Sequence, residues 1–368
     1  MMNFRKAAAL SMAIMLGAAG AVSVSAANPE SAAETVSTAE APAEEGFVII
    51  SNQYFGVTVP VSLCDLMDIV STNNGIKFYQ KSARETCGGF IGEIMVFENL
   101  KEYKDIPHYE RGGEIRYPDG SKLDVVLEYP SDVQADISSE ESMQEYSDLV
   151  TEFGKIASGL TPLKEGTFVP QSEVDTSAVY QGVITKIVND LRERKDKDAL
   201  IADGFSDIYT YIYNLEDKDP LNEIGYAFVD VNHDGYAELL IGSVGDPTIY
   251  DMFTNVDGEA KQVLTSGERN TYVLSDNGGV DKLIRNDGSD SAFRSFTNFL
   301  ALPSDSNELG FQTGFIYDAE KDKDQPFFIT YDKDAADAEG VDEKEFTERM
   351  NDFGTVFDPG FRPLSELL

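Results

Sequence analysis

The chain contains no tryptophan, only two histidines and two cysteines, and 29 basic against 66 acidic residues. Because zinc centres are built mainly from histidine and cysteine, His108 and His233 alone do not make one. They also give little support to a Ser-His-Asp triad. The motifs G-x-S-x-G, H-E-x-x-H, G-x-G-x-x-G and the Walker loop are all missing. The sequence therefore indicates no catalytic residue and no organic cofactor site.

The shortage of basic residues gives a formal net charge of −37. A chain this acidic repels phosphate backbones and anionic membrane surfaces, which argues against a nucleic-acid partner. It attracts divalent cations, whose preferred ligands include carboxylates. The alternative is that the acidity serves only to keep the protein soluble.

The N-terminal segment has the pattern of a secretory signal peptide. Arg5 and Lys6 precede an apolar stretch that ends near Ala21, and Val24, Ser25 and Ala26 form a small-residue cleavage site. The apolar stretch is shorter than the ~20 residues that a bilayer span needs. We expect residues 1–26 to be removed, leaving a secreted, extracellular protein without stable membrane insertion; an uncleaved anchor is the alternative. Residues 27–45 lack aromatics and should form a disordered acidic leader.

Export would favour a disulfide between Cys64 and Cys87, which are the two cysteines of the chain. Both lie in stretches that we expect to form neighbouring strands. Sequence does not show whether their Cβ atoms meet at bonding distance. A bridge and a pair of buried thiols therefore both stay open.

Periodicity predicts an α+β protein of two domains, each a mostly antiparallel sheet with one or more packed helices. The first domain, residues 46–162, has β-branched strands and a hairpin around Pro118-Asp119-Gly120. It should close with a helix that starts at a capping box formed by Ser138 and Glu141. Residues 163–176 carry scattered polar residues and are expected to be a linker.

The second predicted domain, residues 177–368, opens with a helix at residues 179–191. A shorter helix is expected in "FSDIYTYIYNL". From Tyr226 onward, short apolar runs alternate with Gly, Asn and Asp clusters, a pattern typical of an antiparallel meander. The segment "VDEKEFTERMNDFG" should form a last helix.

The stretch "VDVNHDGYAELLIG" places oxygen-bearing side chains at alternate positions around a glycine. Calcium takes six to eight oxygen ligands at about 2.3–2.6 Å, and such a loop points its oxygens inward. The expected metal ligands are Asp230, Asn232, Asp234, the Tyr236 carbonyl and Glu238. An ion-free turn is the alternative, because Asp, Asn and Gly also form tight turns by bonding their own backbone.

An EF-hand does not fit the same stretch. The twelfth position, which would need a bidentate acid, is Ile241, and "AELLIG" predicts a strand in place of the exiting helix. Glu238, at the ninth position, can close the site if the chain runs strand, loop, strand. His233 falls between ligand positions and should point to solvent.

Residues 230–238 resemble the calcium loops of FG-GAP or integrin-α repeats, which read D-x-[DN]-x-D-G-x-x-[DE]. The resemblance implies a calcium site in a hairpin, and one copy implies neither a propeller nor an integrin-like function. Residues 178–300 resemble uncharacterised exported proteins of anaerobic Gram-positive bacteria, in which a helix precedes a "YALYDIDGDGxxELLIG"-like hairpin and a meander. The order of hairpins and closing helix in the first domain is similar to the PsbP-like α+β fold.

The sequence is compatible with two alternative functions. The first is an exported, calcium-stabilised, non-enzymatic binding or envelope-associated protein, whose partner is an extracellular protein or carbohydrate that sequence does not identify. The alternative is an extracellular hydrolase of polysaccharide or peptide, with two carboxylates about 5–10 Å apart in a pocket. Glycosidase clefts often stack sugars on tryptophan, which is absent here. We therefore favour the binding protein.

Overall fold

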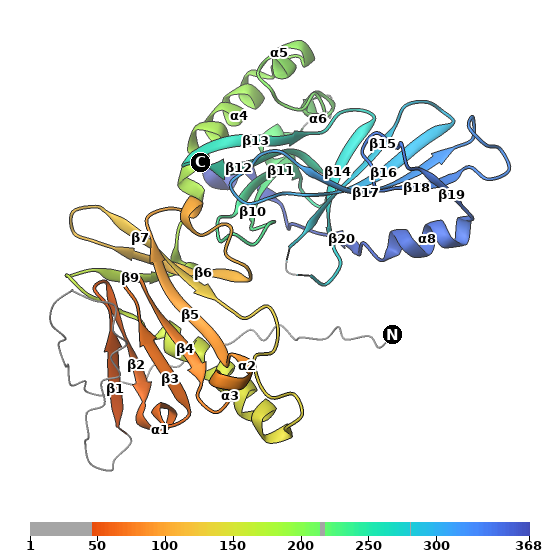
Figure 1. The fold of residues 1–368 in the computed structure, drawn as a ribbon. Coiled ribbons are helices and arrows are strands. Elements are labelled where there is room, and N and C mark those ends of the chain that lie inside the picture. Colours follow the sequence, from red (N-terminus) through yellow and green to blue (C-terminus); the bar gives the residue numbers. More distant parts are fainter. Residues whose placement is uncertain (1–45, 214–217, 280) are drawn as a thin grey trace. The chain divides into compact units, whose positions relative to one another are not determined.

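The computed structural model describes residues 46–213, 218–279 and 281–368 (Figure 1). The predicted signal peptide and leader lie outside these residues. Antiparallel strands dominate and helices are fewer, so the architecture is α+β as expected. The chain divides into two compact units: the part up to Glu93 with Asp132–Lys164, and Ile94–Ser131 with Glu165–Leu368. Residues 94–131, which we expected in the first domain, therefore group with the C-terminal part.

The first unit has small antiparallel sheets and one long helix. Its strands are β1 (Phe47–Ser51), β2 (Phe55–Pro60), β3 (Met67–Ser71), β4 (Gly75–Gln80) and β8 (Thr161–Pro162). Its helices are α1 (Val61–Cys64), α2 (Arg84–Cys87) and α3 (Glu140–Ser158). Helix α3 buries one face, and its Phe153 packs edge-on against Phe78 of β4 with ring centroids 5.3 Å apart. Strand β5 (Phe90–Phe97) runs across the boundary between the units.

The N-cap of helix α3 is Ser139, one residue later than the predicted cap Ser138. The side chain of Ser139 accepts a hydrogen bond from the Ser142 N–H at 3.2 Å. Ser138 does not cap the helix, because its hydroxyl donates to Asp136 in a tight turn. The capping box of Ser138 and Glu141 was therefore wrong by one position, although the helix itself is confirmed.

Both cysteines are free thiols. The expectation that they lie in neighbouring strands is wrong, because Cys64 ends α1 and Cys87 ends α2. Pro60 favours the local turn at the end of β2, since its ring fixes φ near the helical value.

Thiol titration of the unfolded, unreduced protein is expected to count two thiols, because both cysteines are free. A count of zero would instead establish a disulfide between Cys64 and Cys87.

The second unit is built on a twelve-stranded antiparallel sheet (Figure 1). The strand order is β19-β18-β17-β16-β15-β14-β12-β11-β10-β21, with β13 paired to β12 and β20 to β14. The strands are β10 (Ile224–Val229), β11 (Glu238–Ser243), β12 (Ile249–Val256), β13 (Glu259–Thr265), β14 (Asn270–Asp276), β15 (Leu283–Ser289), β16 (Arg294–Ala301), β17 (Gly310–Asp318), β18 (Phe327–Thr330), β19 (Glu339–Val341), β20 (Thr355–Phe357) and β21 (Arg362–Pro363). The meander is thus confirmed.

Helices cover this sheet at two places. The helices are α4 (Gln181–Glu193), α5 (Lys197–Ala202), α6 (Tyr209–Tyr213), α7 (Pro220–Glu223) and α8 (Glu343–Asn351). Helix α4 packs Ile187 and Leu191 into a core with Leu239 and Ile241 of β11. Leu240, between them, enters a separate core on the opposite face, which explains the continuous apolar run of β11. Helix α8 packs Phe346 against Phe315, with centroids 5.4 Å apart.

The second unit also contains β6 (Tyr109–Arg116), β7 (Lys122–Glu128) and β9 (Thr167–Pro170). Strands β6 and β7 form the predicted hairpin. Strand β9 pairs with β6, so the expectation that residues 163–176 form a linker is wrong. Gly113 permits this pairing, because a Cβ there would lie 2.2 Å from the Val169 carbonyl oxygen. Pro170 is tolerated because β9 ends there.

Within the described residues, no helix is long and apolar enough to cross a bilayer.

Candidate metal site

The predicted calcium loop connects β10 to β11. The two strands pair antiparallel from Ile224 opposite Ser243 to Val229 opposite Glu238, so the loop comprises residues 230–237. A strand follows the loop, as expected, and the EF-hand geometry is excluded. The backbone passes through left-handed conformations at His233 (φ 55°) and Gly235 (φ 86°), which turns the chain sharply. His233 is exposed, as its place in the pattern predicts.

Backbone N–H groups hold the first carboxylates of the loop. Asp230 accepts from the N–H of Asp234 at 3.1 Å and from the N–H of Gly235 at 2.9 Å. Asp234 accepts from the N–H of Tyr236 at 2.8 Å. The Asn232 amide donates to the other Asp234 oxygen at 3.1 Å. The loop therefore brings Asp230, Asn232 and Asp234 together, as the spacing predicts.

Glu238 lies at the base of the loop and is fully buried. One of its carboxylate oxygens accepts from the Val231 N–H at 2.8 Å, and the other accepts from the Thr254 hydroxyl at 3.0 Å. The Tyr236 side chain leaves the loop and donates its hydroxyl to Asp124 at 2.9 Å. The Tyr236 side chain therefore takes no part in the loop. The predicted metal ligand at this position is the backbone carbonyl of Tyr236.

Two of the three loop acids are fully buried, and none of the three forms an ion pair within the part of the chain that the structure describes. Asp234 is 2% exposed and Glu238 0%. None of the ion pairs among the described residues involves Asp230, Asp234 or Glu238. Burial raises the pKa of Asp234 to about 7, and it also raises the pKa values of Asp230 and Glu238 above their ordinary range. Asp230 further raises the pKa of Asp234, and Asp234 and Asp230 both raise the pKa of Glu238, because a nearby negative charge disfavours a second one.

In the part of the chain that the structure describes, no three His, Cys, Asp or Glu side chains stand together in an arrangement that could hold a metal ion. The carboxylates of the loop instead point at the backbone and hydroxyl donors named above. Binding an ion would therefore require Asp234 and Glu238 to turn part of their oxygens toward a common centre.

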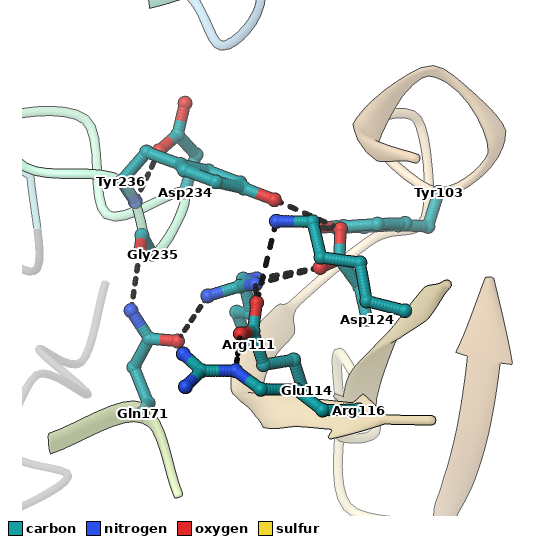
Figure 2. Close-up of polar contacts among 10 residues, drawn as sticks. Tyr103, Arg111, Glu114, Arg116, Asp124, Gln171, Asp234, Gly235 and Tyr236 are labelled. Carbon is teal, nitrogen blue, oxygen red and sulfur yellow. Dashed lines mark hydrogen bonds and ion pairs between the residues drawn. The ribbon is translucent and has the colours of Figure 1, made fainter. Parts of the chain in front are cut away.

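A buried ionic cluster, which no motif in the sequence predicted, lies beside the loop (Figure 2). Arg111 of β6 has a fully buried side chain, and its Nη2 lies 2.6 Å from Asp124 and 3.2 Å from Glu114. Arg116 and Lys122, which are half-exposed, also contact Glu114 at 2.5 and 3.3 Å. Burial alone would lower the pKa of Arg111, but the Asp124 carboxylate raises it above the ordinary value, so the guanidinium stays charged.

Two loop residues join this cluster. The Arg111 guanidinium lies over the Tyr236 ring, 4.4 Å from its centroid. Gln171 accepts from Arg111 Nη1 at 2.5 Å, and its amide donates to the Gly235 carbonyl (Figure 2). Tyr103 and Tyr236 both donate their hydroxyls to the same Asp124 oxygen, at 2.8 and 2.9 Å.

A second loop, between β14 and β15, lies against the candidate site. The Lys282 N–H donates to the Val231 carbonyl at 2.8 Å. Burial is the main cause that raises the pKa of Tyr109 to about 12, and Asp234, Asp230 and Asp281 raise it further. Burial raises the pKa of Asp281 overall, and His233 of the loop acts to lower it, so Asp281 lies within electrostatic reach of the loop. No local pattern in the sequence marks it, because it is far along the chain from Asp230.

No protein family, curated protein or solved structure matches this chain.

Proposed function

We propose that the β10–β11 loop binds Ca²⁺ through Asp230, Asn232, Asp234, the Tyr236 carbonyl and Glu238. The observation that carries the proposal is that Asp234 and Glu238 are buried and Asp230 is partly buried, while none of the three takes part in an ion pair among the described residues. Buried carboxylates need a compensating cation or protons. The nearby acids Asp124 and Glu114 are ion-paired with Arg111, whereas no ion pair within the described part of the chain reaches the loop acids, and Arg111 only lowers the pKa of Asp234 without contacting it as an ion pair.

The chemistry of the donors favours calcium over other metals. All donors are oxygens, and His233 is exposed, so nothing in the loop favours zinc. Magnesium demands a nearly ideal octahedron at about 2.0–2.1 Å and gives up its water reluctantly. Calcium accepts irregular oxygen shells, which suits a loop whose carboxylates are also held by backbone N–H groups.

The wider proposal is an exported, calcium-stabilised, non-enzymatic protein with two domains that binds an extracellular protein or carbohydrate. The two compact units support the two domains. The pattern of Arg5, Lys6 and the apolar stretch after them supports export. Extracellular calcium is high enough for sites with Kd values of about 10⁻⁴–10⁻³ M. A structural site in a hairpin needs no tighter binding than that.

Thermal unfolding with calcium, with magnesium and with chelator tests the site. Calcium at a hundredfold excess over Kd should stabilise the native state by about 2.7 kcal/mol, because it binds only the folded loop. The melting temperature of the wild type should fall on chelation, and that of Asp234→Ala should not respond. Asp246→Ala, which removes an exposed acid from the next hairpin loop, is the matched control and should keep the response. An unchanged melting temperature of the wild type on chelation would contradict the proposal.

A further inference from the structure

Strand β6 contacts the loop at the peptide that joins Gly235 to Tyr236. A Cβ on Gly235 would lie 2.5 Å from the Cβ of Arg111, so a glycine is needed here for the close approach of β6. The φ of 86° at this position also favours glycine. On one side of the peptide, Gln171 donates to the Gly235 carbonyl. On the other, the Tyr236 ring lies under the Arg111 guanidinium and its hydroxyl bonds Asp124. Residues distant in sequence thus fix this peptide from both ends.

The same peptide bears directly on the candidate ligands. The N–H of Tyr236 bonds the Asp234 carboxylate, and the N–H of Gly235 bonds Asp230. The Tyr236 carbonyl is itself a proposed ligand. Of these groups, only the Tyr236 N–H belongs to this peptide, and the Gly235 N–H and the Tyr236 carbonyl belong to the peptides on either side of it. A shift of this peptide would therefore move the donor to Asp234 directly, and it would displace the donor to Asp230 and the carbonyl ligand through the shared Cα atoms. Metal sites lose affinity when the groups that support their ligands are loosened.

The charges of the cluster do not oppose a cation in the loop. Arg111 carries one positive charge, and the buried Asp124 and Glu114 carry two negative charges around it. Arg116 and Lys122 lie on the outer side of Glu114 and are half-exposed, where water screens them. The buried part of the cluster is therefore net negative, although its guanidinium packs against the loop.

We propose that Arg111 is a positioning residue for the calcium loop, and that ion binding in turn orders the β6–β7 hairpin through Arg111, Gln171 and Tyr236. This inference rests on the proposed calcium site. Coupling between two parts of a protein is reciprocal, so a hairpin that positions the loop must itself be stabilised when the ion binds. The loop and the hairpin therefore form one calcium-dependent element.

Two measurements on the full chain test the coupling. Calcium titration calorimetry should give a Kd at least tenfold weaker in Arg111→Lys than in the wild type. Lysine keeps the charge but lacks the planar fork that reaches Asp124, Glu114 and Gln171 together. Arg294→Lys is the control, since Arg294 is also an ion-paired arginine, although a partly exposed one, and it lies on β16. Its Kd should stay within twofold of the wild type.

Hydrogen exchange distinguishes coupling from a merely structural role of Arg111, because a structural role predicts no effect of calcium on exchange in the β6–β7 hairpin. Calcium should slow exchange of the amides in residues 109–128 of the wild type, and this calcium effect should be absent in both Arg111→Lys and Asp234→Ala. If Arg111→Lys does not fold, Gln171→Ala tests the same link, because it removes the amide that joins Arg111 Nη1 to the Gly235 carbonyl and leaves Arg111 itself in place. Tyr236→Phe keeps the ring and should weaken binding less than Arg111→Lys.

The outcomes separate the two proposals. If the wild type binds no calcium, the proposed site fails and the coupling fails with it. If the wild type and Arg111→Lys bind calcium equally, and calcium leaves exchange in residues 109–128 unchanged, the coupling is overturned while the site stands. Weaker binding in Arg111→Lys together with loss of the exchange effect supports the inference.

Discussion

Replacing Arg111 with alanine should lower the free energy of unfolding by about 3–5 kcal/mol, the cost of leaving buried charges without their partner. Asp124 and Glu114 are each 3% exposed at the side chain, and Arg111 lies between them with no exposure. After the substitution, Asp124 would keep only the hydroxyls of Tyr103 and Tyr236 as donors. Urea unfolding in the presence of chelator measures the effect without any contribution from ion binding.

Two further variants show whether charge compensation is the cause. Arg116→Ala removes a half-exposed arginine that also pairs with Glu114, and it should cost about 1 kcal/mol or less because surface pairs are weak. Arg111→Ala combined with Asp124→Asn should recover part of the loss, since the neutral amide needs no cation. Equal losses for Arg111→Ala and Arg116→Ala, or no recovery in the double variant, would refute this explanation.

The buried cluster could have been inferred from the hairpin that the sequence does predict. Counting outward from the Pro118–Gly120 turn pairs Arg116 with Lys122 and places Glu114 directly opposite Asp124. Like charges at opposed positions destabilise a sheet unless a counter-charge lies between them. Arg111 is that counter-charge. The local pattern "YERGGEIR" does not show this, because only the register reveals that the two acids are neighbours.

The calcium loop, unlike the cluster, was predictable from local sequence alone. All of its proposed ligands lie within residues 230–238, so their spacing alone fixes which groups come together. The grouping of residues 94–131 with the C-terminal part, in contrast, depends on contacts such as Arg111 with Gln171 and Asp124 with Tyr236. These contacts join side chains 60 and 112 positions apart. Composition marks a boundary near residue 163, but it carries no signal for pairings of this range.

Strand β9 was missed because its residues are ambiguous. "TFVP" is only four residues long and stands between "KEG" and "QSE", which are typical of a loop. Its strand character comes from pairing with β6, where Ile115 lies opposite Phe168. Short edge strands of this kind depend on tertiary context more than on their own propensity.

Stability of the second unit should depend on pH through Asp251 on β12, whose side chain is fully buried. One of its oxygens accepts from the Tyr209 hydroxyl at 2.5 Å and from the Ser206 N–H at 3.1 Å. The other accepts from the Thr265 hydroxyl at 2.8 Å and from the Gln262 amide at 3.2 Å. Burial raises the pKa of Asp251 from 3.8 to about 6, although these four donors act to lower it.

The sign of the pH effect follows from this raised pKa. The folded protein holds the Asp251 proton more tightly than the unfolded chain does. The resulting stabilisation is therefore complete below about pH 4 and is lost as the pH rises through about 6. A shift from 3.8 to about 6 corresponds to about 3 kcal/mol at 1.36 kcal/mol per pKa unit. Many other acids titrate over the same range, so the contribution of Asp251 must be isolated by comparison with a variant.

Asp251→Asn provides that comparison, because asparagine has the shape of the acid and never ionises. Its carbonyl can keep the bonds from Tyr209 and Ser206, and its amide can donate to the Thr265 hydroxyl. From pH 7 to pH 4, the wild type should gain about 2–3 kcal/mol in free energy of unfolding relative to Asp251→Asn. Glu308→Gln, which removes an exposed acid, should run parallel to the wild type. Parallel curves for Asp251→Asn as well would mean that Asp251 stays ionised in the core, held by its four donors rather than by a proton.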